Sequence, residues 1–202
     1  MDEFLQQVVD NMRKNEFEVV ELHTAQEACD YLNEHIAAGK TVGVGGSVSA
    51  RATGILEKLQ EKGCTVYSHW GVPKEEVNPI RRKAIGADVY LCSANAVTRQ
   101  GKLVLIDGAG NRAAAVCFGP EQVYFVISHS KVVDGINTAI ARIKKTACPP
   151  NARRQGLDTA CARTGMCGPD CHDSMCRLTL AVDRAPRGRK ITVLFVEETL
   201  GY

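Results

Sequence analysis

The sequence Thr-Val-Gly-Val-Gly-Gly-Ser at residues 41–47 decides the fold expected for this chain. Its first four residues form a short apolar run typical of a buried strand, and Gly45-Gly46-Ser47 suits a tight turn. Ser47 or Ser49 can then cap a helix that continues to about Lys62. A strand, a glycine turn and a helix in this order indicate a parallel α/β unit.

Helical and strand-like segments also alternate on both sides of this stretch. We expect helices at residues 4–12, 24–39, 47–62, from 79, 112–118 and 134–146, and strands at 17–22, 41–44, 64–67, 88–92, 122–128, 178–182 and 191–196. A turn at 96–101 leading into 102–106 predicts a hairpin at the sheet edge. The alternation predicts a parallel-rich sheet with right-handed crossovers.

Length and composition favour one soluble α/β domain over residues 1–202. The chain has 202 residues, 45% of them hydrophobic and 24% charged, and a formal net charge of +2. So small a net charge gives no strongly positive surface for binding nucleic acid. Aromatic residues make up 5% of the chain, which is too few for a surface that stacks on bases. No apolar run reaches the ~20 residues of a membrane span. The first residues do not resemble a secretory signal, so we expect a cytoplasmic protein.

Four of the nine cysteines are clustered in one short segment. Pro149-Pro150 is expected to end the preceding helix, and residues 148–177 show no hydrophobic period. So long a loop is uncommon in a compact domain unless something organises it. Thiolates are soft ligands for zinc or iron–sulfur clusters. The predicted ligands in this cysteine-rich loop are Cys161, Cys167, Cys171 and Cys176.

The spacing of these cysteines favours an iron–sulfur cluster, with the four-iron four-sulfur type preferred, over zinc. Structural zinc sites usually combine two close cysteine pairs, whereas these gaps are unequal and lie in one contiguous loop. His172 could replace one cysteine, and Cys148 is a spare. Four unrelated surface thiols are the alternative without a metal. Nearby arginines, among them Arg153 and Arg154, could offset the negative charge of four thiolates.

Two glycine-containing turns are candidates for a small anionic ligand. Backbone N–H groups at Gly45-Gly46-Ser47 could face an anion at a strand end, or the glycines could serve packing alone. In the second turn, Asn111 and Arg112 could orient a carboxylate or phosphate, but an Asx turn explains the same residues. His69-Trp70 could form a pocket wall. The candidate ligand-binding residues are Gly45, Gly46, Ser47, Asn95, Thr98, Asp107, Gly108, Asn111 and Arg112. We find no convincing catalytic set.

Nearly the whole chain resembles the lactate-utilisation (LUD) domain family in its short, single-domain form. The resemblance rests on residues 43–47, 93–98, 107–112 and 151–167, and on Gly201-Tyr202. It implies a fold related to ribose-5-phosphate isomerase, glucosamine-6-phosphate deaminase and the CoA transferases, in which the first glycine turn lies at the ligand site. The catalytic residues of those enzymes are not recognisable here.

Other LUD-domain proteins occur in iron–sulfur systems that oxidise lactate to pyruvate. The resemblance therefore implies a metal-binding, electron-transfer or accessory subunit in the redox metabolism of small organic acids. A partner oxidoreductase subunit would carry out the oxidation, since no flavin motif is visible. The alternative is an enzyme that binds a phosphate, carboxylate or CoA ligand, with a structural zinc site. Pairing of the 102–106 hairpin could support a homo-oligomer.

Overall fold

The computed structural model describes residues 2–169, 171 and 173–202, and these residues confirm the parallel α/β architecture. Six strands form one sheet in which every neighbouring pair is parallel. Their order is β1 (Glu18–Leu22), β10 (Lys190–Val196), β7 (Gln122–Ser128), β4 (Val89–Cys92), β2 (Thr41–Val44) and β3 (Thr65–Ser68). Apolar runs without alternation form the central strands because both faces of the sheet are covered.

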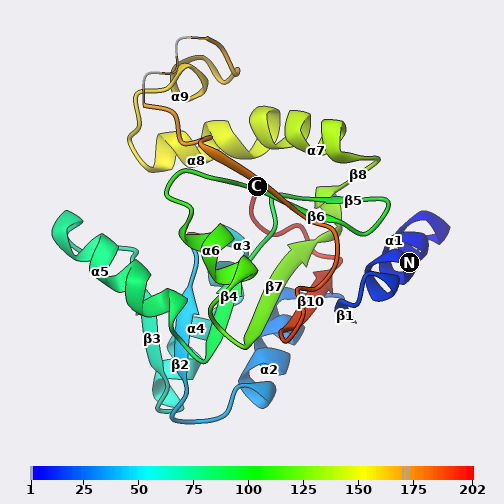
Figure 1. The fold of residues 1–202 in the computed structure, drawn as a ribbon, viewed down its shortest axis with the longest axis vertical. Helices are drawn as coiled ribbons and strands as arrows, with labels where there is room; N and C mark the ends of the chain where they lie inside the picture. Colours follow the sequence, from blue (N-terminus) through cyan, green and yellow to red (C-terminus); the bar gives the residue numbers. More distant parts are fainter. Residues whose placement is uncertain (1, 170, 172) are drawn as a thin grey trace.

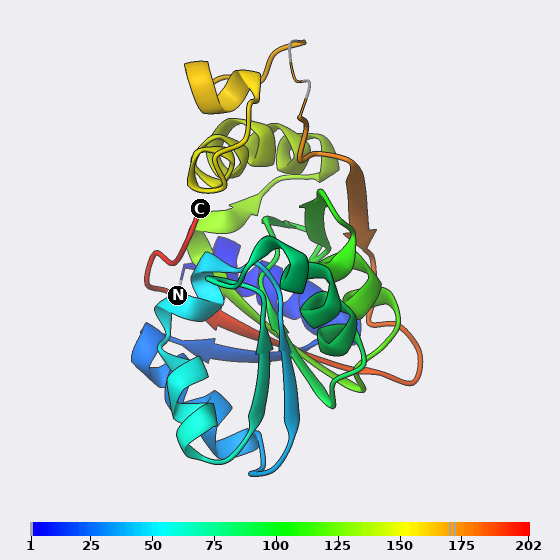
Figure 2. The same ribbon diagram turned by 90° about the vertical axis from the view of Figure 1, so that its left-hand side faces the viewer.

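Helices cover both faces of this sheet (Figures 1 and 2). One face packs against α1 (Glu3–Lys14), α5 (Lys74–Ile85) and α6 (Asn111–Cys117). The other packs against α2 (Ala25–His35), α3 (Val48–Ala52) and α4 (Ile55–Glu61). Neighbouring residues on a strand contribute to opposite cores: Tyr90 is buried in the first and Leu91 in the second. This alternation is what the pleat of a strand requires.

A second sheet holds the predicted hairpin, which corrects its expected place at the edge of the main sheet. Its strand order is β8 (Val132–Val133), β5 (Ala96–Thr98), β6 (Leu103–Asp107) and β9 (Leu178–Val182). The β5–β6 pair is antiparallel, as a hairpin must be. Leu103 and Leu105 face the core of the main sheet, whereas Val104 and Ile106 face a third apolar cluster. The hairpin is apolar on both faces and therefore forms an inner layer.

The third cluster joins this sheet to a helical layer at the top of Figure 1. In this layer, the prediction that the helix ends at Pro149-Pro150 is wrong. The chain continues from α7 (Ile136–Arg142) through a π-helical turn, η2 (Ile143–Ala147), into α8 (Cys148–Arg154). The prolines fall in the first turn of α8, just after the wider π turn interrupts the regular hydrogen-bond ladder. A missing proline N–H is tolerated at such a position.

Two other helices differ from their expected bounds. The helix expected from Pro79 begins five residues earlier, at Lys74, after Pro73 and with Glu75 and Glu76 in its first turn. Acidic residues there favour a helix start. The helix expected over 47–62 is split into α3 and α4 at Gly54, whose φ of 72° no regular helix allows.

The segment 148–177 is more ordered than its lack of period predicts. It contains α8 and a second short helix, α9 (Ala160–Thr164), which Thr159 caps by accepting a hydrogen bond from the Ala162 N–H. His172, the possible substitute ligand, lies outside the described residues. Within the described part of the chain, no helix is long and apolar enough to cross a membrane.

Candidate functional site

The glycine turn after β2 lies where the carboxyl ends of the parallel strands meet. The Gly45 N–H donates to the Leu91 carbonyl (2.9 Å), and the Ser47 hydroxyl accepts from the Ala50 N–H (3.0 Å) to cap α3. The turn thus serves packing and capping. A Cβ on Gly46 would meet only the rings of His69 and Trp70 at 3.6 Å or more, so this side of the turn faces a wall of aromatic side chains.

A small cavity of about 60 Å³, here called the inner cavity, opens beside this turn. It lies between the strand ends and the layer formed by α7, η2 and α8. Its polar lining consists of Ser47, Ser49, Ser93, Asn95, Arg112, Lys131, Asn151 and Tyr202. Of the predicted ligand-binding residues, Gly46, Ser47, Asn95 and Arg112 therefore line one cavity, whereas Gly45 does not line it.

Lys131 is the buried cation of the inner cavity. It ends the short 3₁₀ helix η1 (His129–Lys131), which follows β7, and only 3% of its surface is exposed. Its ammonium donates to the hydroxyls of Ser49 (2.8 Å) and Ser93 (3.0 Å), and more weakly to the Ala94 carbonyl (3.4 Å). Burial, with smaller contributions from Arg142 and Arg112, lowers the pKa of Lys131 to about 7.

Arg112 is a second cation at the same cavity, but its guanidinium is bound within the chain. It donates to Asp107 Oδ1 from Nε (2.9 Å) and from Nη2 (2.5 Å). It also donates to the carbonyls of Ser93 (3.0 Å) and Ile106 (2.9 Å) and to the side-chain oxygen of Asn95 (2.8 Å). These bonds tie the ends of β4 and β6 to α6. In this structure Arg112 builds the cavity wall.

A wider groove of about 570 Å³, the outer groove, continues from the inner cavity. The two share Gly46, Ile106, Arg112, Asn151 and Met175. Trp70 lines the groove with the guanidinium groups of Arg154 and Arg51 at 4.1 and 4.7 Å from its ring centre. Lys74 and Arg81 add positive charge to the lining. His69-Trp70 thus forms a pocket wall, as the sequence suggested.

His69 is kept neutral in this basic groove. Burial, and then the charges of Arg81 and Arg154, lower its pKa to about 4. Its Nδ1 is buried without a hydrogen-bond partner in the described structure. A neutral imidazole beside several cations avoids adding a further positive charge.

The other predicted ligand-binding residues separate into two groups. Asp107, Gly108 and Asn111 line the outer groove. Thr98 lines neither the cavity nor the groove: it is fully buried, and its hydroxyl accepts a hydrogen bond from the Lys102 N–H. Ligand contacts at all these positions remain predictions.

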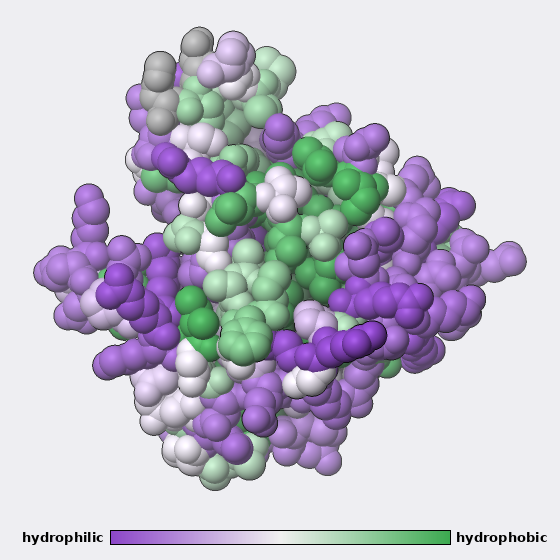
Figure 3. Space-filling model, in the orientation of Figure 1, coloured by the Kyte–Doolittle hydropathy of each residue, from purple (hydrophilic) through white to green (hydrophobic). Residues whose placement is uncertain are grey.

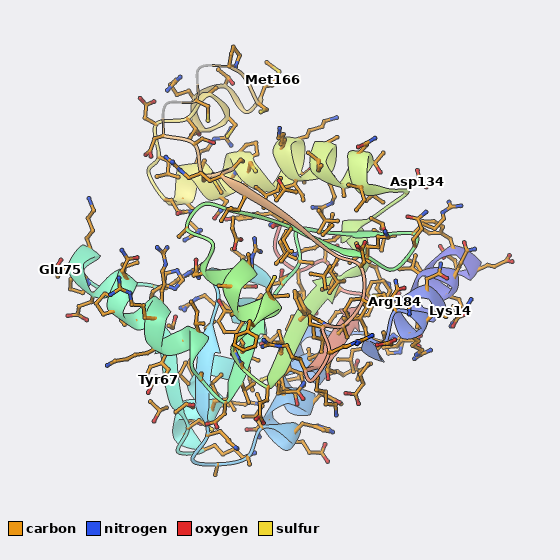
Figure 4. All side chains as sticks on the ribbon, in the orientation of Figure 1. Lys14, Tyr67, Glu75, Asp134, Met166 and Arg184 are labelled. Carbon is orange, nitrogen blue, oxygen red and sulfur yellow. The ribbon has the colours of Figure 1, made fainter. Side chains whose placement is uncertain are left out.

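The clustered cysteines line a third cavity, of about 200 Å³, between η2, α8, α9 and the segment before β9. We call it the cysteine pocket. Its thiols are those of Cys148, Cys161, Cys167, Cys171 and Cys176. Cys148, the additional thiol noted in the sequence, thus lines the same pocket as the four predicted ligands. Each of the five is a free cysteine. Figure 4 shows Met166 at the outer end of this helical layer, away from the main sheet.

One pair of thiols in the pocket is in direct contact. The sulfurs of Cys148 and Cys176 lie 3.3 Å apart. This hydrogen bond raises the pKa of Cys148 and lowers that of Cys176 to about 7, so Cys176 is the thiol of the pair that loses its proton first. Among the described residues, no three Cys, His, Asp or Glu side chains form a group that could hold a single metal ion. The thiols of the pocket are soft ligands that are spread around one cavity. This arrangement fits an iron–sulfur cluster, in which each thiolate binds a different iron atom.

The arginines near the cysteines have other partners in this structure. Arg153 Nε donates to the Ala162 carbonyl (2.9 Å) and so holds α9 against α8. Arg154 lies over Trp70 in the outer groove. The cation that lines the cysteine pocket is instead Lys144, from the π-helical turn.

Sequence reasoning missed Lys131, Ser49 and Ser93 as site residues, and it gave Cys148 only as a spare thiol. Lys131 does carry a signal, because a lysine directly after the apolar strand at 122–128 lies at a strand end of a parallel sheet. Cys148 carries none, since its approach to Cys176 depends on the uninterrupted helix through Pro149-Pro150.

Comparison with known proteins gives a family and a fold. The model of the LUD domain matches residues 5–196. The crystal structure of a DUF162 family protein from Deinococcus radiodurans superposes with a TM-score of 0.52 at 15% identity, over 96% of each chain. At this identity the likeness is one of fold. No curated protein matches the chain.

Proposed function

Because this chain belongs to the LUD-domain family, which is associated with lactate utilisation, we propose that it binds an iron–sulfur cluster and serves the redox metabolism of small organic acids as an electron-transfer or accessory subunit. The observation that carries the proposal is the cysteine pocket, where five thiols from separate segments surround one cavity. Free thiols gathered in this way are the ligands that iron–sulfur clusters use. Nine free cysteines also favour a reducing, cytoplasmic location.

The proposed ligands are Cys161, Cys167, Cys171 and Cys176, and Cys148 is now a fifth candidate. A bound four-iron four-sulfur cluster would supply one-electron transfer. The chain's own contribution is to bring the thiols together and to place the Lys144 ammonium beside them, where its charge helps to lower the pKa of Cys176.

The position of the pocket also supports the proposed link to small acids. Cys148 and Met175 line both the cysteine pocket and the inner cavity. A ligand in the cavity would thus be separated from a metal centre by the side chains of a single layer. An oxidoreductase partner subunit, and a homo-oligomer, stay part of the proposal.

Metal analysis after purification without oxygen tests the proposal. We expect iron and acid-labile sulfide at about four each per chain, with a broad visible absorbance. Cys167→Ser should lower the iron content strongly, whereas the matched variant Cys117→Ser, at an exposed cysteine outside the pocket, should keep it. Comparing Cys148→Ser with Cys161→Ser identifies the fourth ligand. A colourless protein whose metal content is the same in both Cys167→Ser and Cys117→Ser would contradict the proposal.

A second candidate function is an enzyme that binds a phosphate- or CoA-type ligand, with structural zinc in the cysteine pocket. The outer groove favours it, since Lys74, Arg81 and Arg154 surround a cavity large enough for such a ligand. One zinc per chain would support this alternative, as would thermal stabilisation by sugar phosphates or CoA esters.

A further inference from the structure

The ammonium of Lys131 is buried without an opposite charge. Its three hydrogen-bond acceptors are two hydroxyls and one carbonyl, and among the described residues no carboxylate forms an ion pair with it. The two hydroxyls are oriented toward it as acceptors, because Ser49 donates to the Leu200 carbonyl (3.0 Å) and Ser93 to the Ala94 carbonyl (3.0 Å). Burying a cation in this way is costly unless an anion accompanies it.

The charged neighbours of Lys131 have partners of their own. Arg112 faces it from α6 and is neutralised by Asp107 of β6. Arg142 faces it from α7 and donates to the carbonyls of Asn95 (2.8 Å) and Ser130 (3.3 Å) and to the main-chain oxygen of Tyr202 (3.5 Å), which belongs to the terminal carboxylate of this chain and so balances the guanidinium charge. Lys131 is therefore the cation of the inner cavity whose charge no carboxylate among the described residues balances.

We propose that the inner cavity binds the carboxylate group of a small organic acid, with the Lys131 ammonium as its counter-ion. The size of the cavity, about 60 Å³, limits the ligand to a few heavy atoms. Its hydroxyl and amide lining, from Ser47, Ser93 and Asn151, can bond a second polar group of such an acid. The inference rests on the proposed function only for the choice of acids to test.

The donor set favours a monoanionic carboxylate over phosphate. Phosphate sites commonly use arginine forks or several free donors. Here the guanidinium groups of Arg112 and Arg142 are already bound to Asp107 and to main-chain carbonyls. The Lys131 ammonium has only neutral acceptors, and its charge matches one negative charge. A carboxylate would take the place of its longest hydrogen bond, the one to the Ala94 carbonyl (3.4 Å).

The test uses the single tryptophan as a reporter. Trp70 lies beside Gly46, which lines the inner cavity, so ligand binding should change its fluorescence. Acetate, L-lactate, pyruvate and inorganic phosphate are titrated separately at pH 6.5, and the thermal midpoint is recorded with each. We expect binding by at least one of the carboxylates and weaker or absent binding of phosphate.

Two variants locate the binding. Lys131→Met should weaken carboxylate affinity by roughly tenfold to a hundredfold, because a charged hydrogen bond is lost. Lys40→Met, which removes an exposed lysine just before β2, at the opposite end of that strand from the glycine turn, should change it less than about twofold. Unchanged affinity in Lys131→Met, an equal loss in both variants, or binding of phosphate alone would overturn the inference.

The wild-type protein gives a measurement that does not depend on the folding of a variant. Carboxylate affinity should be constant below about pH 7 and fall by up to about tenfold per pH unit above it, as Lys131 loses its proton. Affinity that is independent of pH between 6 and 9 would contradict the role of Lys131. Iron and sulfide are measured on the same preparations. Carboxylate binding without a cluster would refute the cluster and leave this inference standing, and the reverse result would refute only the inference.

Discussion

Arg112 and Lys131 are two buried cations at the same end of the parallel sheet, and they have opposite surroundings. Arg112 lies against Asp107, and the rest of its guanidinium is bonded to Ser93, Asn95 and Ile106. Lys131 has only neutral acceptors and faces a cavity. A cation whose charge is balanced inside the chain holds the fold together. One whose charge is not balanced is available to a ligand.

The largest expected effect comes from breaking the balanced pair. Asp107→Asn should leave the Arg112 charge buried without its partner and lower the free energy of unfolding by about 3–5 kcal/mol. Urea unfolding followed by circular dichroism measures it. The exposed pair of Arg13 with Glu21 is the matched control, where Glu21→Gln should cost less than about 1 kcal/mol. Equal losses at both sites would remove the basis of the comparison.

The unbalanced cation should respond in the opposite direction. The folded protein lowers the pKa of Lys131 to about 7 from an ordinary value near 10.5, so below pH 7 the full cost of burying its charge opposes folding. Lys131→Met should therefore raise the free energy of unfolding by about 2–4 kcal/mol at pH 6. The gain should shrink as the pH rises from 7 toward 10.5, where the unfolded wild type also loses its proton.

Urea titrations of wild type and Lys131→Met at pH 6, 8 and 10 measure this difference. A variant that is less stable than wild type at every pH would mean that the ammonium is compensated after all, and that Lys131 is structural in the same way as Arg112.

The smallest expected effect concerns the acceptors of Lys131. Ser93→Ala removes one hydroxyl that accepts from the ammonium and donates to the Ala94 carbonyl. We expect a loss of about 1 kcal/mol in the free energy of unfolding, the usual net value of one hydrogen bond. The same urea titration at pH 7 detects it. A loss as large as that of Asp107→Asn would show that Ser93 belongs to the structural network of Arg112.

The difference between Arg112 and Lys131 also shows which parts of the site can be predicted from the sequence. Asp107, Asn111 and Arg112 stand out because a glycine-containing turn follows an apolar strand, and the structure does place them at strand ends. Nothing in the local sequence says that Asp107 binds Arg112 five residues later. Lys131 is harder to find, because a single lysine after a strand is ordinary in a sequence. Its burial depends on contacts with Ser49, Ser93 and Ala94, which are distant from it in the sequence.

The fold was more predictable than the site because it depends on repeated patterns. Apolar strands and amphipathic helices recur along the chain, and their parallel arrangement is confirmed. The wrong predictions concern residues that are compatible with two different structures. Proline ends most helices, yet Pro149-Pro150 lies in the first turn of α8. Residues 103–106 are all apolar, which fits an edge hairpin less well than the inner sheet that they form.

Surface polarity differs between regions as well. In Figure 3 apolar residues gather along the middle of the face that is shown, between hydrophilic flanks. Phe118 and Leu178 are among the exposed large apolar side chains of the described chain, at 85% and 49% exposure. Such side chains are compatible with contact to another protein.

The wall that Cys148 and Met175 form between the inner cavity and the cysteine pocket has a thermodynamic consequence. A change in the pocket that moves this wall alters the affinity of the cavity for its ligand. By reciprocity, the ligand then shifts the equilibrium in the pocket by the same factor. For a one-electron centre, tenfold tighter binding of the ligand to the reduced protein would raise the reduction potential by about 59 mV. Where the proposed cluster and the proposed ligand are both bound, occupancy of the cavity would change the potential at which the cluster accepts an electron.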